Sequence, residues 1–160
     1  QLRAVSALSV SEGKDGPGAD ITCQRDGLGR LIIPATALAG CLRRVIDDPG
    51  WGGKPDDKKD AAVSRITTRD APFAGDVEQL EVRDGVAIDR VTGAAAEHML
   101  YEREVVAPGA VFTFSLSLDV VASGAEHPQH DGLMLVAHLV NSLEAGIAVG
   151  GSTTRGLGQV

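Results

Sequence analysis

Residues 111–120 read Val-Phe-Thr-Phe-Ser-Leu-Ser-Leu-Asp-Val and are the clearest strand in the sequence. Apolar side chains at the even positions 112–120 alternate with polar ones at 113–119, which is the period of a β-strand with one buried face. Gly132 to Ala145 follows after a loop and carries apolar residues at helical spacing: Leu133, Val136, Leu139, Val140 and Leu143. This half of the chain predicts a strand followed by a helix.

The first half contains the same kinds of element. Leu2 to Val10 alternates loosely as a first strand, and Val63 to Arg69 is β-like. Between them Thr36 to Ile46 carries Leu38, Leu42, Val45 and Ile46 on one helical face, after Pro34. Short extended pieces at 21–25 and 30–33 flank the turn Asp26-Gly27-Leu28-Gly29, and a glycine-rich turn with a possible last strand ends the chain at 147–160. The order predicts an α+β fold with a ferredoxin-like or RRM-like βαββαβ core.

Three segments are additions to that core. They are a loop at 47–60 with Trp51, a charged excursion with few apolar residues at 81–106, and the C-terminal glycine-rich loop at 150–158. We also expect a connecting loop at 11–18. We expect a single domain over 1–160, with 81–106 inserted. The chain starts at Gln1 within a strand pattern, so we expect sequence upstream of it. The chain is either a free subunit or one module of a fused chain.

Composition limits the classes of function. With 22 acidic and 15 basic residues the net charge is −7, which argues against non-specific nucleic-acid binding. Cys23 and Cys41 lack CxxC spacing and read as free thiols in a reducing compartment. No apolar run approaches the ~20 residues of a membrane span, so we expect a cytoplasmic protein with no membrane partner.

Three segments could bind a ligand. The glycine-rich loop offers backbone N–H groups, hydroxyls and an arginine to phosphate oxygens, although a tight connection between helix and strand is an equal alternative. It lacks the Gly-Lys-Ser/Thr ending of a P-loop. The small residues after Pro34 favour either a phosphate approach or an ordinary amphipathic helix. The charged excursion is either a solvated loop or an interaction arm.

Taken together in this order, these segments resemble the RAMP superfamily, and within it the backbone subunit of the Csm and Cmr complexes of type III CRISPR effectors. Ile33-Pro34 to Arg43 resembles the family's helix start, and Ser64-Arg65 to Asp70-Ala71 its Ser-Arg to Asp-Ala strand. Ile88-Asp89-Arg90-x-Thr92-Gly93 resembles the base of its thumb hairpin, and Gly150 to Gly158 its terminal loop. The family's Gly-Ser-Ser-Leu-Lys-Gly is Ala-Thr-Ala-Leu-Ala-Gly at 35–40, without the lysine and one serine.

The resemblance implies a guide-RNA-binding backbone subunit of an antiviral ribonucleoprotein. Its partners would be CRISPR guide RNA, complementary target RNA, other effector subunits and copies of itself. It further implies an endoribonuclease that cleaves target RNA at regular intervals, with an aspartate in a loop and Mg²⁺ or another divalent metal. The family spacing of Asp, five residues, then Asp occurs at Asp20 and Asp26, which makes Asp20 the catalytic and metal-binding candidate, with Asp26 in the turn. The RNA-binding candidates are Arg25, Arg43, Arg44, Arg65, Arg90, Gly150, Gly151, Ser152, Thr153, Thr154, Arg155 and Gly156.

Three alternatives remain. A non-catalytic structural RAMP subunit would bind guide RNA without needing Asp20. An unrelated RRM-like protein-interaction domain would assemble without RNA. A guide-processing ribonuclease would need a general-base histidine from among His98, His127, His130 and His138, none of which has metal-ligand spacing.

Overall fold

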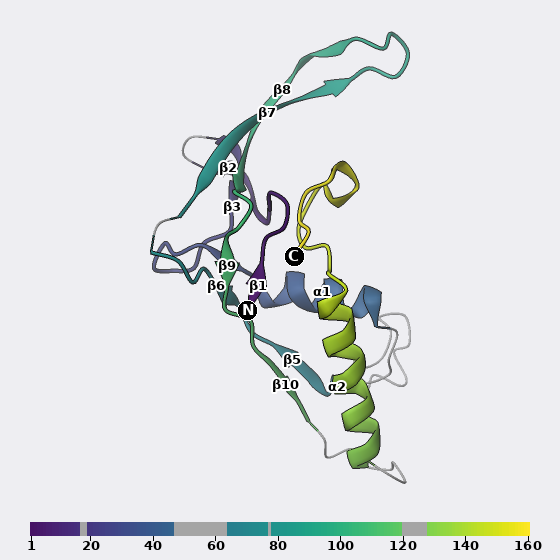
Figure 1. Ribbon diagram of the computed structural model, residues 1–160. Coiled ribbons are helices and arrows are strands. Elements are labelled where there is room, and N and C mark those ends of the chain that lie inside the picture. Colours follow the sequence, from purple (N-terminus) through teal and green to yellow (C-terminus); the bar gives the residue numbers. More distant parts are fainter. Residues whose placement is uncertain (17–18, 47–63, 77, 120–127) are drawn as a thin grey trace.

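The computed structural model describes residues 1–16, 19–46, 64–76, 78–119 and 128–160 as a mixed α+β fold (Figure 1). Two α-helices occur in these ranges, α1 (Ala35–Val45) and α2 (Pro128–Glu144), with a short 3₁₀ turn η2 (Thr153–Arg155). The strands are β1 (Leu2–Arg3), β2 (Ser11–Gly16), β3 (Ala19–Cys23), β4 (Ile32–Ile33), β5 (Ile66–Thr68), β6 (Ala71–Pro72), β7 (Leu80–Ile88), β8 (Ala95–Val106), β9 (Val111–Phe112) and β10 (Leu116–Leu118).

Short antiparallel pairs lie where one core sheet was expected. β1 pairs with β9, and β10 pairs with β5. On the other side of the first strand, the N–H groups of Val5 and Ser6 donate to the carbonyl of Gln159 at 2.7 and 3.3 Å. The spatial order is therefore the C-terminal segment, the first strand, residues 111–118 and then β5.

The expected strand 111–120 is divided into β9 and β10. Thr113 donates its N–H to the carbonyl of Pro72 at 2.9 Å, and Arg69 donates to the carbonyl of Ser115 at 3.2 Å. Residues 111–118 thus change backbone partner along their length, from β1 to the segment around β6 and then to β5. This change interrupts the ladder. The predicted alternation is nevertheless confirmed, since Phe112 is buried and Thr113, Ser115 and Ser117 are exposed.

The helices cover this core with leucines. Leu38 and Leu42 of α1 are fully buried, and Leu135 and Leu139 of α2 are almost so. The face predicted for α2 was wrong in part, because Leu133, Val136 and Val140 are exposed. The buried stripe follows the i, i+4 spacing of Leu135 and Leu139 and continues to the half-buried Leu143.

The charged excursion forms a long hairpin that projects from the core (Figure 1). β7 and β8 pair antiparallel from Leu80↔Val106 outward, and β8 also pairs in parallel with β3, which gives the order β2-β3-β8-β7. The charged residues 81–106, predicted as an excursion from the core, lie in this hairpin. Residues 11–16, predicted as a loop, instead form β2 because their backbone pairs with β3; an edge strand tolerates such a polar, glycine-containing sequence.

The loop predicted at 47–60, with Trp51, falls outside the described residues, as does most of the loop expected before the second helix. Within the described ranges, no helix has the length and apolar character to cross a membrane.

Candidate nucleic-acid interface

The glycine-rich loop is fastened at both ends to the segment after β1. The N–H of Gly151 donates to the carbonyl of Ser9, and the N–H of Gly158 to the carbonyl of Ala7, both at 2.8 Å. Gly150 has φ +86°, and a Cβ there would overlap the carbonyl oxygen of Ser9. Glycine is therefore required at 150 for both its backbone angle and its close approach. These contacts give the loop a defined conformation, and its solvent-accessible part runs from Gly151 to Gly156.

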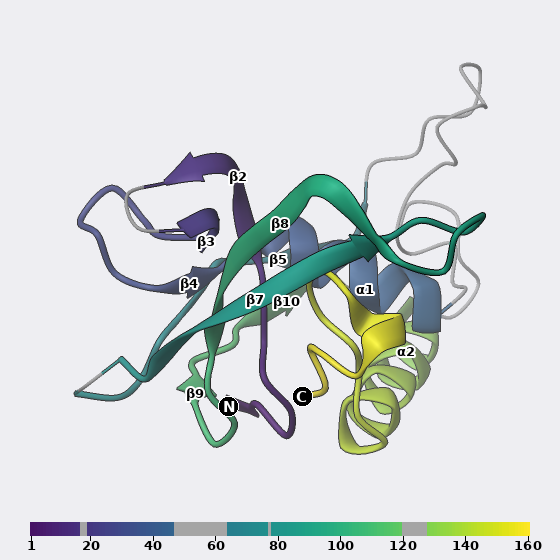
Figure 2. The same ribbon diagram turned by 90° about the horizontal axis from the view of Figure 1, so that it is seen from above.

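Two arginines join this loop to the base of the β7–β8 hairpin. Arg103 of β8 donates to the hydroxyl of Ser152 at 2.8 Å, and Arg155 donates to the hydroxyl of Tyr101 at 3.1 Å. The guanidinium of Arg103 also lies 5.8 Å from the centroid of the Tyr101 ring, within cation–π range. The views in Figures 1 and 2 place the loop beside the hairpin accordingly. Hydroxyls, guanidinium groups and an aromatic ring thus form one surface.

Tyr101 keeps its position because Gly85 lies opposite it on β7. A Cβ at 85 would overlap the tyrosine ring, so the ring lies across the bare backbone of the neighbouring strand. Neither Tyr101 nor Arg103 was predicted as a binding residue. Their i, i+2 spacing puts both side chains on one face once this segment is a strand, and no strand was predicted there.

Ser152 has a left-handed backbone, with φ 58° and ψ 30°. Such a conformation is uncommon for a residue other than glycine, asparagine or aspartate. Residues held this way cluster at binding sites, and here the conformation turns the hydroxyl of Ser152 toward Arg103.

Asp20 lies in strand β3, so the expectation of a loop aspartate was wrong. The cause is the parallel pairing of β3 with β8. One carboxylate oxygen of Asp20 accepts the backbone N–H of Glu102 at 2.8 Å, and the residue is exposed. Among the described residues no group of three or more His, Cys, Asp or Glu side chains could hold a metal. A single carboxylate suits Mg²⁺ only where phosphate oxygens and water complete the coordination.

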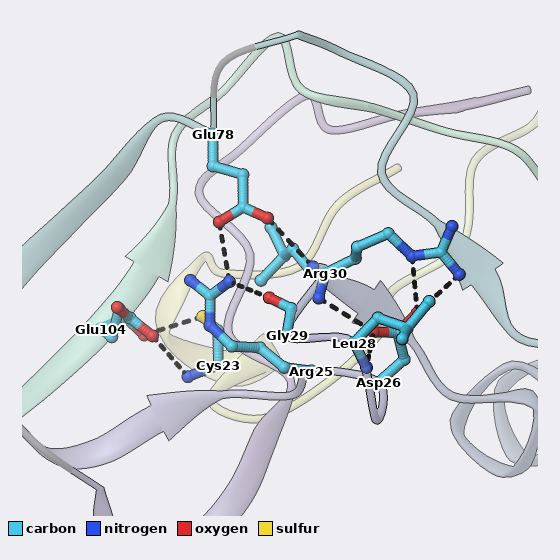
Figure 3. Close-up of polar contacts among 9 residues, drawn as sticks. Cys23, Arg25, Asp26, Leu28, Gly29, Arg30, Glu78 and Glu104 are labelled. Atoms are coloured by element: carbon cyan, nitrogen blue, oxygen red, sulfur yellow. Dashed lines mark hydrogen bonds and ion pairs between the residues drawn. The ribbon is translucent and has the colours of Figure 1, made fainter.

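Asp26 closes the turn before β4 (Figure 3). One of its oxygens accepts the N–H groups of Leu28 and Arg30 at 2.9 Å, and the other pairs with the Arg30 guanidinium at 2.8 Å. The pKa of Asp26 is lowered, chiefly by the backbone hydrogen bond from Arg30. Asp26 therefore stabilises the turn, as predicted.

Arg25 is held by neighbours on both sides of the same turn. It donates to the carbonyl of Gly29 at 2.7 Å and pairs with Glu78 at 2.8 Å. The other oxygen of Glu78 accepts the N–H of Leu31 at 3.0 Å (Figure 3). The hydrogen bond to Glu78 is the main cause of the raised pKa of Arg25. Its contacts in this chain are structural.

The start of α1 already has a carboxylate. Asp70 accepts the N–H of Ala35 at 2.7 Å, and the hydroxyl of Thr68 donates to the carbonyl of Ala35 at 2.9 Å. Pro34 is the N-cap residue and supplies no side-chain hydrogen bond. Since Asp70 occupies the positive end of the helix, an RNA phosphate at this terminus would meet a negative charge.

The other predicted arginines are dispersed. Arg43 and Arg44 are exposed in the last turn of α1, at the opposite end from Asp70. Arg65 donates to the carbonyl of Asp119 at 3.0 Å. Arg90 is exposed in the hairpin tip, beside the turn that Asp89 closes. Of the predicted RNA-binding set, only the glycine-rich loop residues meet in one place.

Of the four candidate general-base histidines, only His138 has a side chain that the structure describes. His138 is exposed on α2, and His127 falls outside the described residues. Within the described ranges, no histidine belongs to a group of three or more side chains that could hold a metal.

Comparison with known proteins gives one clear relationship. No curated protein matches the sequence. The fold is similar to a chain in the cryo-EM structure of type III-B Cmr-β bound to cognate target RNA, with a TM-score of 0.74 at 15% identity. It is also similar to a chain of Cmr-β in the apo state, with a TM-score of 0.71 at 14% identity. Both comparisons cover 98% of this chain and 93% of the other. The family model of the RAMP superfamily matches residues 1–160, and the chain therefore belongs to the RAMP superfamily.

Proposed function

We propose that this chain is an RNA-binding backbone subunit of a type III CRISPR effector. Family membership and the likeness to Cmr-β chains support the assignment. The observation that carries it is the surface at the hairpin base, where Ser152 and Arg155 of the loop bind Arg103 and Tyr101 of β8. Guanidinium and hydroxyl groups bind phosphate, and aromatic rings stack on bases.

Guide RNA would lie along the glycine-rich loop, with the β7–β8 hairpin reaching between guide and complementary target. Other effector subunits and further copies of the chain would be its protein partners. We also propose that the short core sheets are segments of one ferredoxin-like sheet, because their spatial order is that of a βαββαβ unit. The proposed domain is 1–160, with 81–106 as the thumb-like insertion.

Target cleavage at Asp20 is the finer proposal. The exposed carboxylate has one oxygen bound to the N–H of Glu102, which fixes its orientation. Its second oxygen accepts no hydrogen bond among the described residues, so Asp20 is suited to hold a divalent metal jointly with RNA phosphate. Such a metal, when bound, would polarise the scissile phosphate. The protein's own contribution would be to keep one oriented negative charge beside the hairpin base.

Two variants of Asp20 separate chemistry from structure. Asp20→Ala removes the charge and the hydrogen-bond acceptor, whereas Asp20→Asn removes the charge and retains an oxygen for the N–H of Glu102. Each would be assembled with guide RNA and given labelled complementary RNA and Mg²⁺. Regularly spaced cuts that disappear in both variants, with target binding intact, are expected for a catalytic carboxylate.

Other outcomes identify the alternatives. Cuts that survive in Asp20→Asn alone would show that the residue acts only as a structural acceptor. No cuts from any protein, with RNA bound, would leave the non-catalytic structural subunit as the function. Assembly that does not depend on RNA would contradict the whole proposal and favour a protein-interaction domain.

A further inference from the structure

The base of the β7–β8 hairpin is sorted by charge between its two faces. Cross-strand partners point to the same face and alternate residues to opposite faces. Arg83 therefore shares a face with its partner Arg103, while Asp84 shares the other face with Glu102. Glu104 follows Glu102 at i+2, so it belongs to the second face as well.

The face with the arginines is the one that meets the glycine-rich loop. Arg103 reaches Ser152, and Arg155 of the loop reaches Tyr101, which lies on the same face at i−2 from Arg103. Arg83, Arg103 and Arg155 thus belong to this face, where Glu81 pairs with Arg83. The net charge of −7 for the whole chain conceals a local positive surface.

Arg83 and Arg103 form a like-charge cross-strand pair, which by itself opposes strand pairing. Exchanging Arg83 and Asp84 would have placed opposite charges across the strands on both faces. Arg83 pairs with Glu81 at 2.7 Å, but both side chains are nearly half exposed, at 46% and 47%. An exposed pair of this kind is weak, so the guanidinium of Arg83 remains free to exchange partners.

We propose that Arg83 and Arg103 bind one backbone phosphate of single-stranded RNA between them. The inference rests on the proposed function and adds to it two binding residues and the face of the hairpin on which the RNA lies. Guanidinium groups suit phosphate because each presents paired N–H donors to its oxygens. The strand enters on the face of Ser152 and Arg155, and the carboxylates of Asp84, Glu102 and Glu104 repel it from the opposite face.

Asp20 belongs to the acidic side of this division. Ile21 is the partner of Arg103 in the parallel ladder, so Asp20, its neighbour, points to the face of Glu102. The phosphate-binding pair and the proposed cleavage residue therefore lie on opposite faces of one sheet. A strand bound by Arg83 and Arg103 would be held away from Asp20.

The test uses a fluorescein-labelled oligouridylate and the purified chain, with fluorescence anisotropy across a series of salt concentrations. Arg83→Gln is the principal variant, because no hydrogen bond or ion pair joins Arg83 to the glycine-rich loop among the described residues. Arg69→Gln is the matched control, since Arg69 is exposed, lies beyond β5 and changes the net charge equally. Thermal unfolding of both variants would verify that each is folded.

For Arg83→Gln we expect about a tenfold loss of affinity, as for a hydrogen bond between charged groups. The slope of log K against log salt should fall by about 0.7, the value for one single-strand phosphate contact. Arg69→Gln should bind as the wild type does. Equal weakening by both variants would reduce the effect to net charge and overturn the inference. Unchanged binding by Arg83→Gln would overturn it too, whereas no binding by the wild-type chain would instead contradict the proposed function.

Discussion

The start of α1 allows a prediction with a worked magnitude. Asp70 supplies the side-chain acceptor for the N–H of Ala35, at 2.7 Å, because the N-cap residue Pro34 has no polar side chain. Replacing a capping acceptor with alanine costs about 1 kcal/mol. Loss of the negative charge near the helix N-terminus adds about 0.3–1 kcal/mol. For Asp70→Ala we therefore expect the free energy of unfolding to fall by about 1.5 kcal/mol.

At this chain length 1 kcal/mol corresponds to about 2–4 °C in Tm, so the shift is about 3–6 °C. Urea unfolding followed by circular dichroism would measure the free energy, and a thermal scan the Tm. Asp70→Asn is the control, because its side-chain oxygen can still accept the N–H of Ala35. This variant should lose only the part of the stability that comes from the negative charge near the helix N-terminus. The reasoning is refuted if Asp70→Ala is as stable as the wild type, or if both variants lose the same free energy.

Two further predictions concern the glycine-rich loop and the buried thiol. Gly150→Ala should destabilise the chain by more than about 2 kcal/mol, because it adds an overlap with Ser9 to the left-handed backbone penalty. Gly156→Ala has open space and should cost about 1 kcal/mol; equal Tm losses in a thermal scan would contradict this. The pKa of the Cys23 thiol is raised from 9.0 to about 12, chiefly by burial and secondly by the negative charge of Glu104. The folded state thus retains a proton that the unfolded state loses, so stability is full below pH 9.0 and declines toward pH 12. Urea unfolding above pH 9.0 should show the free energy of unfolding decline by at most about 1.4 kcal/mol per pH unit. A Cys23→Ala variant should lack the decline that Cys23 causes. Identical pH profiles of the two proteins would contradict the raised pKa of Cys23.

Elements with a strong local pattern could be predicted from the sequence. The alternation at 111–120 located β9 and β10, and the apolar spacing at 36–46 located α1 within a residue of its bounds. The charged excursion was predicted because it lacks core residues at any regular spacing. In each case a local pattern decides the structure, since burial of one face fixes the conformation.

Other features depend on partners distant in sequence. Residues 11–16 form a strand because β3 pairs with them, although glycine and charged residues favour a loop locally. The same pairing of β3 with β8 places Asp20 in a strand, 82 residues from Glu102, whose N–H it accepts. Arg25 looked available for RNA, yet Glu78 binds it across 53 residues. Single-sequence patterns do not carry such contacts, and the arginine pair at the hairpin base was missed for the same reason.

The hydrogen bonds between the two ends of the described chain have a kinetic consequence. The N–H of Gln159 donates to the hydroxyl of Ser6 at 3.0 Å, across 153 residues. Contacts this distant in sequence form late in folding, because loop closure precedes any gain from them. The hairpin, closed by neighbouring strands, can form early, whereas the glycine-rich loop reaches Ser9 and Ala7 only when the ends meet. The proposed RNA-binding surface therefore forms only in the fully folded chain. If RNA binds there, it would select completed molecules over folding intermediates.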